Sequence, residues 1–411
     1  MWLRDGRGAA DEEQWMSARD VSERPMRILH VLRAPLGGLF RHVIDLAREQ
    51  VARGHAVGLI ADSLTGGARA NEVFASLAPK LRLGVSRVPM RRNPHFSDLG
   101  AIAHVRHTIR TSNADVVHGH GSKGAVYARL PGLLPGAFDA IRAYTPHGGS
   151  FNYRPGSGIH RVYMTIERML AAATDIFLFE SAFIESRFNE YVGSTRALSR
   201  VIVNGISPCE FVPVAPNADA ADFLYVGELR AAKGIDTLLE AVAAMRTAAD
   251  LTPRVVLVGS GPDQAMLTAQ ASRLGITGQI SFAGPVPARE AFRLGRVLVV
   301  PSRAESLPYV VLEAAGARIP MVSTNVGGIP EIFGPFKSRL IMPNDAAALS
   351  DAMIGALRGS ATMRAMEADA LAAVVEQRFS IANMADCVMA GYREAIASRE
   401  ARGADALRAA A

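Results

Sequence analysis

Two carboxylates stand close together in a stretch whose pattern suits the binding of an anion. Glu305 lies in the polar loop that follows the apolar run Val297–Val300, and Glu313 lies in the first turns of the helix predicted to begin near Tyr309. Free N–H groups at the start of a helix and in the preceding loop form a natural phosphate site. Glu305 would then lie beside a phosphate or a developing cation, and Glu313 could accept hydrogen bonds from a ribose diol. The alternative is that Glu305 is a solvated loop residue and that Glu313 caps or pairs locally.

The elements that must position these carboxylates repeat a strand–loop–helix pattern. The apolar run Arg27–Leu32 stops at Pro35–Gly38, and a helical pattern then continues to Gly54, a typical C-terminal glycine. Strands that are apolar throughout are typical of a parallel sheet covered on both faces. Further apolar runs in this half lie at 56–61, 115–118, 140–144, 176–179 and 201–203.

A second series of apolar runs occupies the other half of the chain. The segment Ser207–Asp222 carries three prolines and little periodicity, so it is the predicted linker. An Ala-rich helical tail closes the chain from residue 346, with a break at Phe379 and Ser380. The apolar runs of this half lie at 223–227, 255–259, 280–282, 297–300 and 321–323.

The predicted architecture is therefore α/β, with two doubly wound domains in tandem. Ligands on such sheets bind at the carboxyl ends of the strands, so the cleft between the two sheets is the expected site. The predicted divisions are a flexible leader at 1–25, an N-terminal domain at 26–205, a C-terminal domain at 206–378 and a helical tail at 379–411.

Composition excludes several classes of protein. The 411 residues are too many for one ordinary core, and a hydrophobic content of 49% is too high for a disordered chain. No apolar run approaches the roughly 20 residues that span a bilayer, and the first 25 residues lack a secretory signal. Cys209 and Cys387 form neither a disulfide framework nor a metal site, so a reducing, cytoplasmic location is expected.

The charge is unevenly distributed. Residues 26–205 hold 22 Lys and Arg against 12 Asp and Glu, a net charge of +10, whereas the whole chain carries +6. This asymmetry favours a phosphate-bearing partner or a membrane surface, with an ordinary solvated surface as the alternative. Nucleic acid is disfavoured, because the basic residues are scattered and are not interleaved with aromatic ones.

Several short motifs follow one another in a set order along residues 26–393. In this order and at these separations they resemble the retaining glycosyltransferases of family 4, which share the GT-B fold of two Rossmann-like domains. The motifs are Gly37-Gly38, Arg53–Val57, Tyr144–Gly148, Val203–Ile206, Tyr225–Gly234, Val258–Pro262, Glu305 and Glu313 with seven residues between them, and Gly327–Glu331.

The resemblance implies roles for basic residues and glycines in binding a nucleotide-sugar donor. Lys233 would bind the donor diphosphate, and Gly37 and Gly38 would let the backbone approach it closely. Where the family commonly has an arginine, this chain has Glu228, so the phosphate role is assigned to Arg230. Glu228 would then orient Arg230 or Lys233, or face solvent. The family usually needs no metal, and the sequence offers no His/Asp cluster that argues otherwise.

The remaining site residues are also implied by the resemblance. His147 would sit near the donor sugar and donate a hydrogen bond to a sugar hydroxyl or to the β-phosphate, and Glu305 would assist at the reacting centre. His118 and His120 would line the acceptor pocket, or else be ordinary polar residues at a strand end. Val286 would contact the nucleotide base. Because Pro308 has no N–H, the phosphate-facing donors would come from Ser306, Leu307, Tyr309 and Val310.

The resemblance therefore implies a metal-independent, retaining transferase that moves a hexose-type sugar from a nucleotide donor to a saccharide or polyprenyl-diphosphate-linked acceptor. The expected place is the cytoplasm, at the inner face of the membrane, in cell-surface polysaccharide synthesis. Rival readings are a nucleotide-sugar 2-epimerase or a phosphorylase of the same fold, and a non-catalytic sugar-binding scaffold. A dehydrogenase is disfavoured, because no G-x-G-x-x-G follows the first strand.

Overall fold

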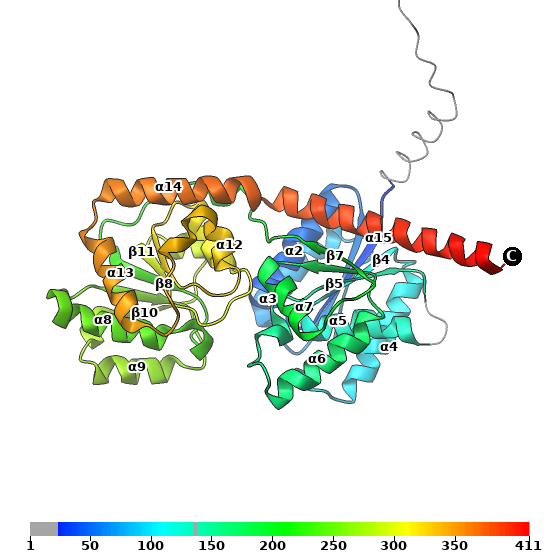
Figure 1. Cartoon of the computed structure of the whole chain (residues 1–411), viewed down its shortest axis with the longest axis horizontal. Coiled ribbons are helices and arrows are strands. Elements are labelled where there is room, and N and C mark those ends of the chain that lie inside the picture. Colours follow the sequence, from blue (N-terminus) through cyan, green and yellow to red (C-terminus); the bar gives the residue numbers. More distant parts are fainter. Residues whose placement is uncertain (1–23, 135–137, 411) are drawn as a thin grey trace, which may run out of the picture.

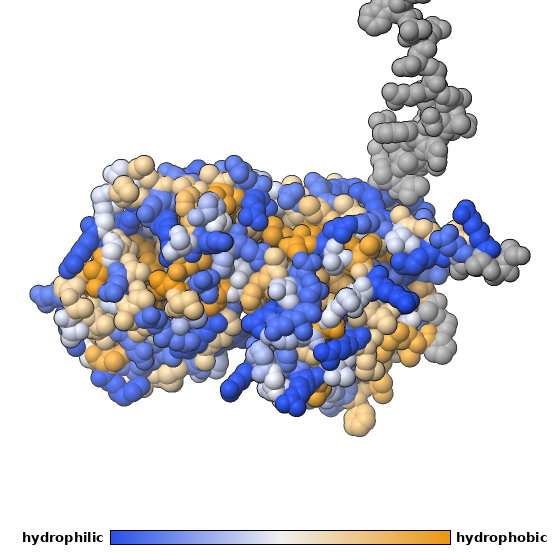
Figure 2. Space-filling view, viewed as in Figure 1, coloured by the Kyte–Doolittle hydropathy of each residue, from blue (hydrophilic) through white to orange (hydrophobic). Residues whose placement is uncertain are grey.

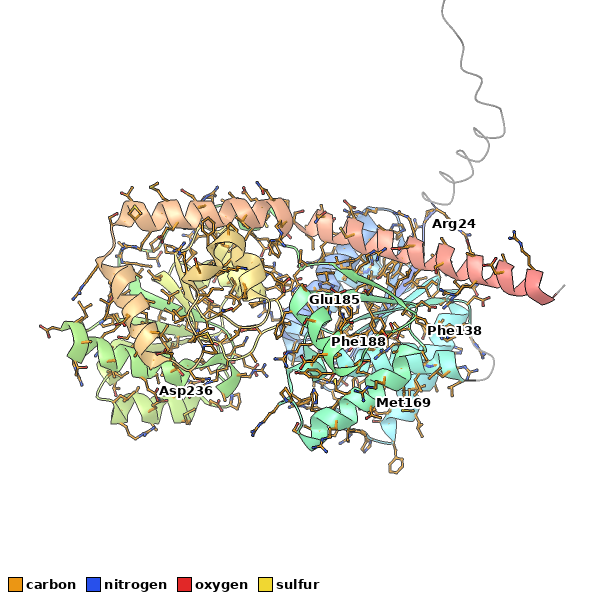
Figure 3. All side chains as sticks on the ribbon, viewed as in Figure 1. Arg24, Phe138, Met169, Glu185, Phe188 and Asp236 are labelled. Carbon is orange, nitrogen blue, oxygen red and sulfur yellow. The ribbon has the colours of Figure 1, made fainter. Side chains whose placement is uncertain are left out.

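The chain folds into two lobes, each built on a parallel sheet with helices on both faces (Figure 1). The computed structural model describes residues 24–134 and 138–410, so nearly all of the predicted leader lies outside the described residues. The side chains drawn in Figure 3 fill the space between sheets and helices in both lobes, and Phe188 is among those buried in the first lobe.

The first sheet has seven parallel strands in the order β3-β2-β1-β4-β5-β6-β7. The edge strand β3 was not predicted, because it is only partly buried and carries Ser86 and Arg87. The last strand lies slightly earlier than the predicted run at 201–203. The strands are β1 (Arg27–Leu32), β2 (Ala56–Asp62), β3 (Val85–Val88), β4 (Val116–His120), β5 (Ile141–Thr145), β6 (Ile176–Phe179) and β7 (Leu198–Val201).

The second sheet has five parallel strands in the order β10-β9-β8-β11-β12. Each coincides with a predicted apolar run to within a few residues, since these strands supply the buried cores of the lobe. They are β8 (Ala221–Val226), β9 (Val255–Val258), β10 (Ile280–Gly284), β11 (Gly295–Val300) and β12 (Met321–Ser323).

Helices connect successive strands in both lobes. In the first lobe they are α2 (Gly37–Ala52), α3 (Gly67–Leu77), α4 (Ser97–Thr111), α5 (Gly121–Arg129), α6 (Gly158–Ala171) and α7 (Ala182–Tyr191). The second lobe contains α8 (Ile235–Ala249), α9 (Gln264–Arg273), α10 (Ala288–Ala291), α11 (Tyr309–Gly316), α12 (Ile329–Phe333), α13 (Ala346–Arg358) and α14 (Ala361–Arg378), and α15 (Ile381–Ala410) ends the chain.

The C-terminal helices tie the two lobes together. Helix α14 runs along the second lobe, and α15 crosses back over the first (Figure 1). There Met384, Val388 and Tyr392 pack in the core formed by β4, β5 and β6. The chain crosses itself closely at the break, since a Cβ on Gly205 would lie 2.4 Å from the Ser380 carbonyl oxygen. The helical tail therefore belongs to the packing of both lobes.

In the space-filling view, hydrophilic and hydrophobic residues are interspersed over both lobes (Figure 2). Among the described residues, no helix combines the length and the apolar character needed to cross a bilayer.

Candidate active site

The carboxyl ends of the two sheets meet at the junction of the lobes. The loop after β5 reaches the loop after β11, because a Cβ on Gly148 would lie 3.1 Å from the Ser306 Cβ. On the same junction, the Glu331 carboxylate of α12 accepts hydrogen bonds of 2.9 Å from the N–H groups of Ala182 and Phe183 at the start of α7. The ends of parallel strands are where ligands bind in such sheets, so this junction is the candidate site.

Lys233 and Glu305 lie side by side, although 72 positions separate them. The Lys233 Nζ is 2.6 Å from the Glu305 Oε1, which also accepts a 2.7 Å hydrogen bond from the Ser302 hydroxyl. Lys233 is held in a tight turn: Gly234 has φ +66°, and a Cβ there would lie 2.0 Å from the Pro301 carbonyl oxygen. The structure thus brings together the predicted diphosphate-binding cation and the predicted carboxylate at the reacting centre.

Arg230 and Glu228 form a more exposed pair. The Arg230 Nε is 3.2 Å from the Glu228 Oε2, and both side chains are about half exposed, at 51% and 53%. Glu228 thus contacts Arg230 and also faces solvent, which are two of the three arrangements foreseen for it. Arg230 therefore lies at the solvent-exposed edge of the site and not in its buried part.

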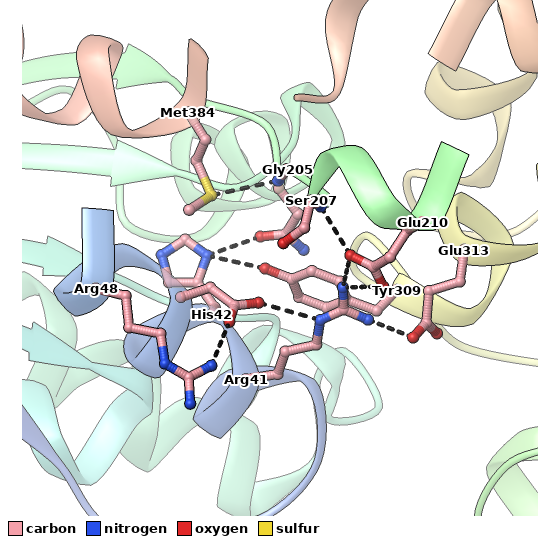
Figure 4. Close-up of polar contacts among 11 residues, drawn as sticks. Arg41, His42, Arg48, Gly205, Ser207, Glu210, Tyr309, Glu313 and Met384 are labelled. Carbon is pink, nitrogen blue, oxygen red and sulfur yellow. Dashed lines mark hydrogen bonds and ion pairs between the residues drawn. The ribbon is translucent and has the colours of Figure 1, made fainter. Parts of the chain in front are cut away.

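Glu313 meets a residue that the sequence analysis missed. The Arg41 guanidinium on α2 is paired with Glu313, with both carboxylate oxygens of Glu210 at 2.6 Å, and with Asp45 at 3.3 Å (Figure 4). It also lies 4.3 Å from the centre of the Tyr309 ring. Burial raises the pKa of Glu313, and the positive charge of Arg41 opposes that rise. No motif marks Arg41; the one available signal was its place in the helix that begins at the predicted glycine pair.

Several predicted donor residues line one cavity at this junction, with a volume of about 540 Å³. Arg41 and other residues of α2 and α3 also line it. Lys233 and Glu305 are not part of this lining and form the separate pair described above. The predicted residues that share the cavity are Gly37, Gly38, Val286, Tyr309 and Glu313.

The loop before α11 is held by bonds to both lobes. Its Leu307 carbonyl accepts a 2.9 Å hydrogen bond from Asn204 Nδ2, and its Ser306 carbonyl accepts one of 2.6 Å from the Gly328 N–H. Leu307 is buried and Pro308 occupies the position before the helix. The amides of Tyr309 and Val310 come before the first intrahelical bond, so they are placed to donate to an anion.

His147 stands where the loop after β5 turns sharply. Its φ of +53° is unusual for a residue with a side chain, and Gly148 follows with φ +74°. The His147 Nε2 lies 3.1 Å from the His120 Nδ1, and the His42 ring packs edge-on against the His147 ring. Burial lowers the pKa of His147 well below its ordinary value. The ring is therefore neutral near pH 7.

His118 and His120 are both buried, so the alternative prediction of polar residues at a strand end describes them better than an acceptor contact. His118 is fully buried, and its ring nitrogens lie 2.7 Å from the Tyr392 hydroxyl and 2.9 Å from the Thr145 hydroxyl. His120 is 1% exposed and lies behind His147. The alternating pattern of β4 turns both side chains to the same face of the sheet, and α15 covers that face.

The histidines do form a cluster, although the sequence shows none. Two groups have ligand atoms within 4.8 Å of one another and could hold a metal ion: His30 with His118 and His120, and His42 with His120 and His147. Several of these nitrogens already bond to one another or to protein groups. Strand register explains the cluster, since His30 on β1 pairs with His118 on β4.

Glu180, directly after β6, is a further residue that the sequence analysis missed. It is 1% exposed, and burial raises its pKa to about 7, against the opposing effect of the His147 and Gly148 amides and the Ser306 hydroxyl. Among the described residues, its carboxylate oxygens make no regular hydrogen bond. A lone acidic residue at the end of the apolar run 176–179 was the signal that could have found it.

Comparisons with known protein families match both lobes. The family model described as "Glycosyltransferase Family 4" matches residues 36–209, and the one described as "Glycosyl transferases group 1" matches residues 210–371. The two matches are contiguous and together take in both sheets except the first strand.

Curated relatives are similar over part or most of the chain. A putative teichuronic acid biosynthesis glycosyltransferase of Bacillus subtilis, TuaC, is 36% identical over 130 residues, which is 32% of this chain and 31% of that protein. The chain thus spans about a third of that relative's length. The glycogen synthase of Mycobacterium tuberculosis H37Rv is 26% identical over 345 residues, 77% of this chain and 82% of that protein.

Solved structures share the fold. The Anabaena protein HepE in complex with UDP-glucose superposes with a TM-score of 0.70 at 19% identity, over 92% of this chain and 100% of that one. The predicted GT-B architecture is therefore confirmed.

Proposed function

Since the chain belongs to the family-4 type of glycosyltransferases with the GT-B fold, we propose that it transfers a hexose from a nucleotide-sugar donor to a saccharide or lipid-linked saccharide acceptor, with retention of configuration. The observation that carries the proposal is the pairing of Lys233 with Glu305 at the junction of the lobes. A cation and a carboxylate in contact there suit a substrate that carries a diphosphate on one side and a developing positive charge on the other.

In the proposed reaction the bond between the sugar C1 and the diphosphate oxygen breaks as the acceptor oxygen bonds to C1 on the same face. The acceptor proton passes to the departing diphosphate, so charge and atoms balance. Lys233 stabilises the negative charge that the diphosphate gains, with help from Arg230 and the Tyr309 and Val310 amides. Glu305, released from Lys233, faces the positive charge on the sugar.

The donor's nucleoside would occupy the cavity beside Tyr309. Glu313 would accept hydrogen bonds from the ribose diol, which requires Arg41 to release Glu313 and keep its two bonds to Glu210. Val286 lines the same cavity, where it would meet the base. Because Lys and Arg supply the positive charge, we propose that the reaction needs no metal.

The acceptor would bind to the first lobe. The net charge of +10 on residues 26–205 would attract a phosphate-bearing or membrane-surface substrate. A polyprenyl-diphosphate-linked saccharide has that chemistry, and one relative is named for a role in teichuronic acid biosynthesis. We therefore place the proposed activity in cell-surface polysaccharide synthesis.

A thermal-shift panel of UDP-, GDP-, ADP- and dTDP-sugars tests the donor assignment. UDP-glucose comes first, because HepE binds it. A donor present at about 100 times its Kd should stabilise the fold by about 2.7 kcal/mol. If none of the nucleotide sugars raises the Tm, the proposed donor assignment is wrong. Formation of an isomerised nucleotide sugar without an acceptor would indicate a 2-epimerase instead.

A further inference from the structure

A line of three histidines, two of them buried and the last partly exposed, connects α2 to the junction of the lobes. It begins at Gln50 on α2, whose Oε1 lies 2.7 Å from the His30 Nε2. The His30 Nδ1 lies 2.9 Å from the His120 Nε2, and the His120 Nδ1 lies 3.1 Å from the His147 Nε2. The line ends at His147, which is partly exposed and whose Nδ1 is the ring nitrogen left for a ligand.

The hydrogen bonds along the three rings must all run in the same direction. A neutral imidazole has one N–H and one lone pair, so each ring donates at one nitrogen and accepts at the other. If Gln50 accepts from the His30 Nε2, then His30 accepts from the His120 Nε2, and His120 accepts from the His147 Nε2. His147 is then left with a bare lone pair at Nδ1. A reversed Gln50 amide would reverse the line and give His147 an N–H there.

The surroundings of Gln50 favour the first direction. The Gln50 amide also faces the Tyr392 hydroxyl. Burial raises the pKa of Tyr392, and the contact with Gln50 opposes that rise. The distance is too long or the angle too poor for a regular hydrogen bond from the Gln50 Nε2. The Tyr392 hydroxyl lies 2.7 Å from the His118 Nδ1, and if its proton is directed there, its oxygen can accept from an amide N–H. With the amide nitrogen on the Tyr392 side, the amide oxygen is left to accept from His30.

The rings of the line are neutral because they are buried. Burial lowers the pKa of His30 to about 4, and it lowers those of His120 and His147 well below the ordinary value. The titratable groups packed around the line are His42 on α2, His118 on β4, Tyr392 on α15, and Glu180 after β6 beside the His147 amide.

We propose that Gln50, His30 and His120 are positioning residues that hold His147 as a hydrogen-bond acceptor at Nδ1, so that it binds a hydroxyl of the sugar and not a phosphate oxygen. A phosphate oxygen carries no hydrogen near pH 7 and has nothing to donate to a lone pair. This differs from the predicted role, in which His147 donates a hydrogen bond. The inference rests on the proposed function only for the identity of the ligand; the proton arrangement is a property of the free protein.

Nitrogen-15 NMR of the full chain with labelled histidines tests the arrangement directly. We expect His30, His120 and His147 each to carry the proton on Nε2. His42 is an internal control with the opposite result. Its Nδ1 lies 3.0 Å from the Asn204 Oδ1, and the bond from Asn204 Nδ2 to the Leu307 carbonyl fixes that amide, so His42 carries its proton on Nδ1. A His147 protonated on Nδ1 would overturn the proposal.

Kinetics of Gln50→Met test its consequence. Without the amide oxygen the direction of the line is no longer fixed, so we expect kcat to fall about 10-fold while the KM for the nucleotide sugar stays unchanged. Gln270→Met is the matched control, because Gln270 is also a buried glutamine but lies on α9, and its loss should leave kcat unchanged. An unchanged kcat in a folded Gln50→Met variant would contradict the proposal.

Gln50→Glu gives a readout that a merely structural role would not produce. A carboxylate accepts from His30 just as the amide oxygen does, so activity should be kept at high pH. When the introduced carboxylate or the His30 ring takes up a proton, the His30 Nδ1 carries an N–H and donates to the His120 Nε2. The direction of the hydrogen bonds along the line is then reversed, and the His147 Nδ1 carries a proton. We expect kcat of this variant to fall more steeply with falling pH than kcat of the parent enzyme, and parallel profiles would contradict the proposal.

The experiments separate this inference from the proposed function. If the chain transfers no sugar, the NMR result on the free protein still decides the proton arrangement. If it transfers sugar and His147 is protonated on Nδ1, the proposed function stands and the inference fails.

Discussion

The two sides of the junction hold polar groups in opposite ways. On the donor side, Lys233 and Glu305 form an ion pair whose side chains are 20% and 9% exposed. On the other side, His30, His118 and His120 are neutral, at most 1% exposed, and bonded to one another or to protein groups. One side carries charge close to solvent, and the other carries fixed dipoles without charge.

This difference in charge and burial indicates that the two sides have different functions in substrate binding. A cation that is partly open to solvent can exchange its carboxylate partner for a charged ligand, because it keeps an anionic partner when a diphosphate replaces the carboxylate. A buried neutral network cannot exchange partners, since every unpaired buried group is costly. The donor side is therefore suited to binding a charged substrate, and the histidine side is suited to orienting an uncharged part of it.

The largest expected effect is on the charged side. Lys233→Ala should lower kcat by about 100- to 1000-fold, because the diphosphate leaves without a fixed cation beside it. Transfer of labelled sugar and a melting curve on the same sample measure this, with the exposed Lys337→Ala as the control. A fully active Lys233→Ala would show that the cation serves only to pair with Glu305.

The buried histidines should make the free energy of unfolding depend on pH. The folded chain keeps His30 and His42 neutral down to about pH 4, whereas the unfolded chain protonates them near 6.5. Between these values the unfolded state binds more protons, so the free energy of unfolding falls as the pH drops, by about 3 kcal/mol for each ring. Glu180 has the opposite effect on the free energy of unfolding between about pH 7 and 4.5. Because its pKa is raised in the folded chain, the folded state binds more protons there, and the free energy of unfolding rises as the pH drops.

The contribution of one ring is isolated by a variant. The difference in unfolding free energy between the parent chain and His30→Asn should narrow as the pH falls below 6.5, because only the parent chain loses stability through the His30 ring. Urea unfolding of both proteins at several pH values measures this difference. A constant difference for His30→Asn would mean that the ring is not held neutral.

A smaller effect distinguishes two of the three carboxylates that pair with Arg41, namely Glu313 and Glu210. Glu313→Gln should raise the KM for the nucleotide sugar about 10-fold, because the ribose diol loses a charged acceptor. Glu210→Gln removes a carboxylate from the same arginine, and it should change that KM by no more than about 2-fold. Equal effects of the two variants would indicate that both act only through Arg41.

The smallest effect is expected at the solvent edge. Arg230→Met should raise the KM for the donor about two- to three-fold, because a half-exposed, solvated pair contributes little. The same titration at high salt should reduce the difference between variant and parent. A loss as large as that of Lys233→Ala would move the principal phosphate contact to Arg230.

The fold was predictable because its buried strands are unbroken apolar runs and its motifs keep a regular order. The meeting of Lys233 and Glu305 followed from both lying just after strands of one sheet, β8 and β11. The edge strand β3 escaped prediction because a half-exposed strand has no such run. Arg41 and Glu210 escaped because their meeting depends on how one lobe sits against the other, which no local pattern contains.

The histidine cluster could not be read from spacing either. His30, His42, His120 and His147 are far apart in the sequence, and only the order of parallel strands places β1 beside β4 and β4 beside β5. Because the β4 histidines end a strand, the sequence left two roles open for them, an acceptor pocket or ordinary polar residues at a strand end. The missing information was that α15 returns from the end of the chain and places Tyr392 against His118.

A crystal structure of the chain with the nucleotide sugar that gives the largest thermal shift tests the central claim most directly. The account predicts the diphosphate against the Lys233 amine, the ribose against the Glu313 carboxylate, and a sugar hydroxyl at the Nδ1 of His147. A diphosphate bound away from Lys233, or a phosphate oxygen against the His147 ring, would contradict it.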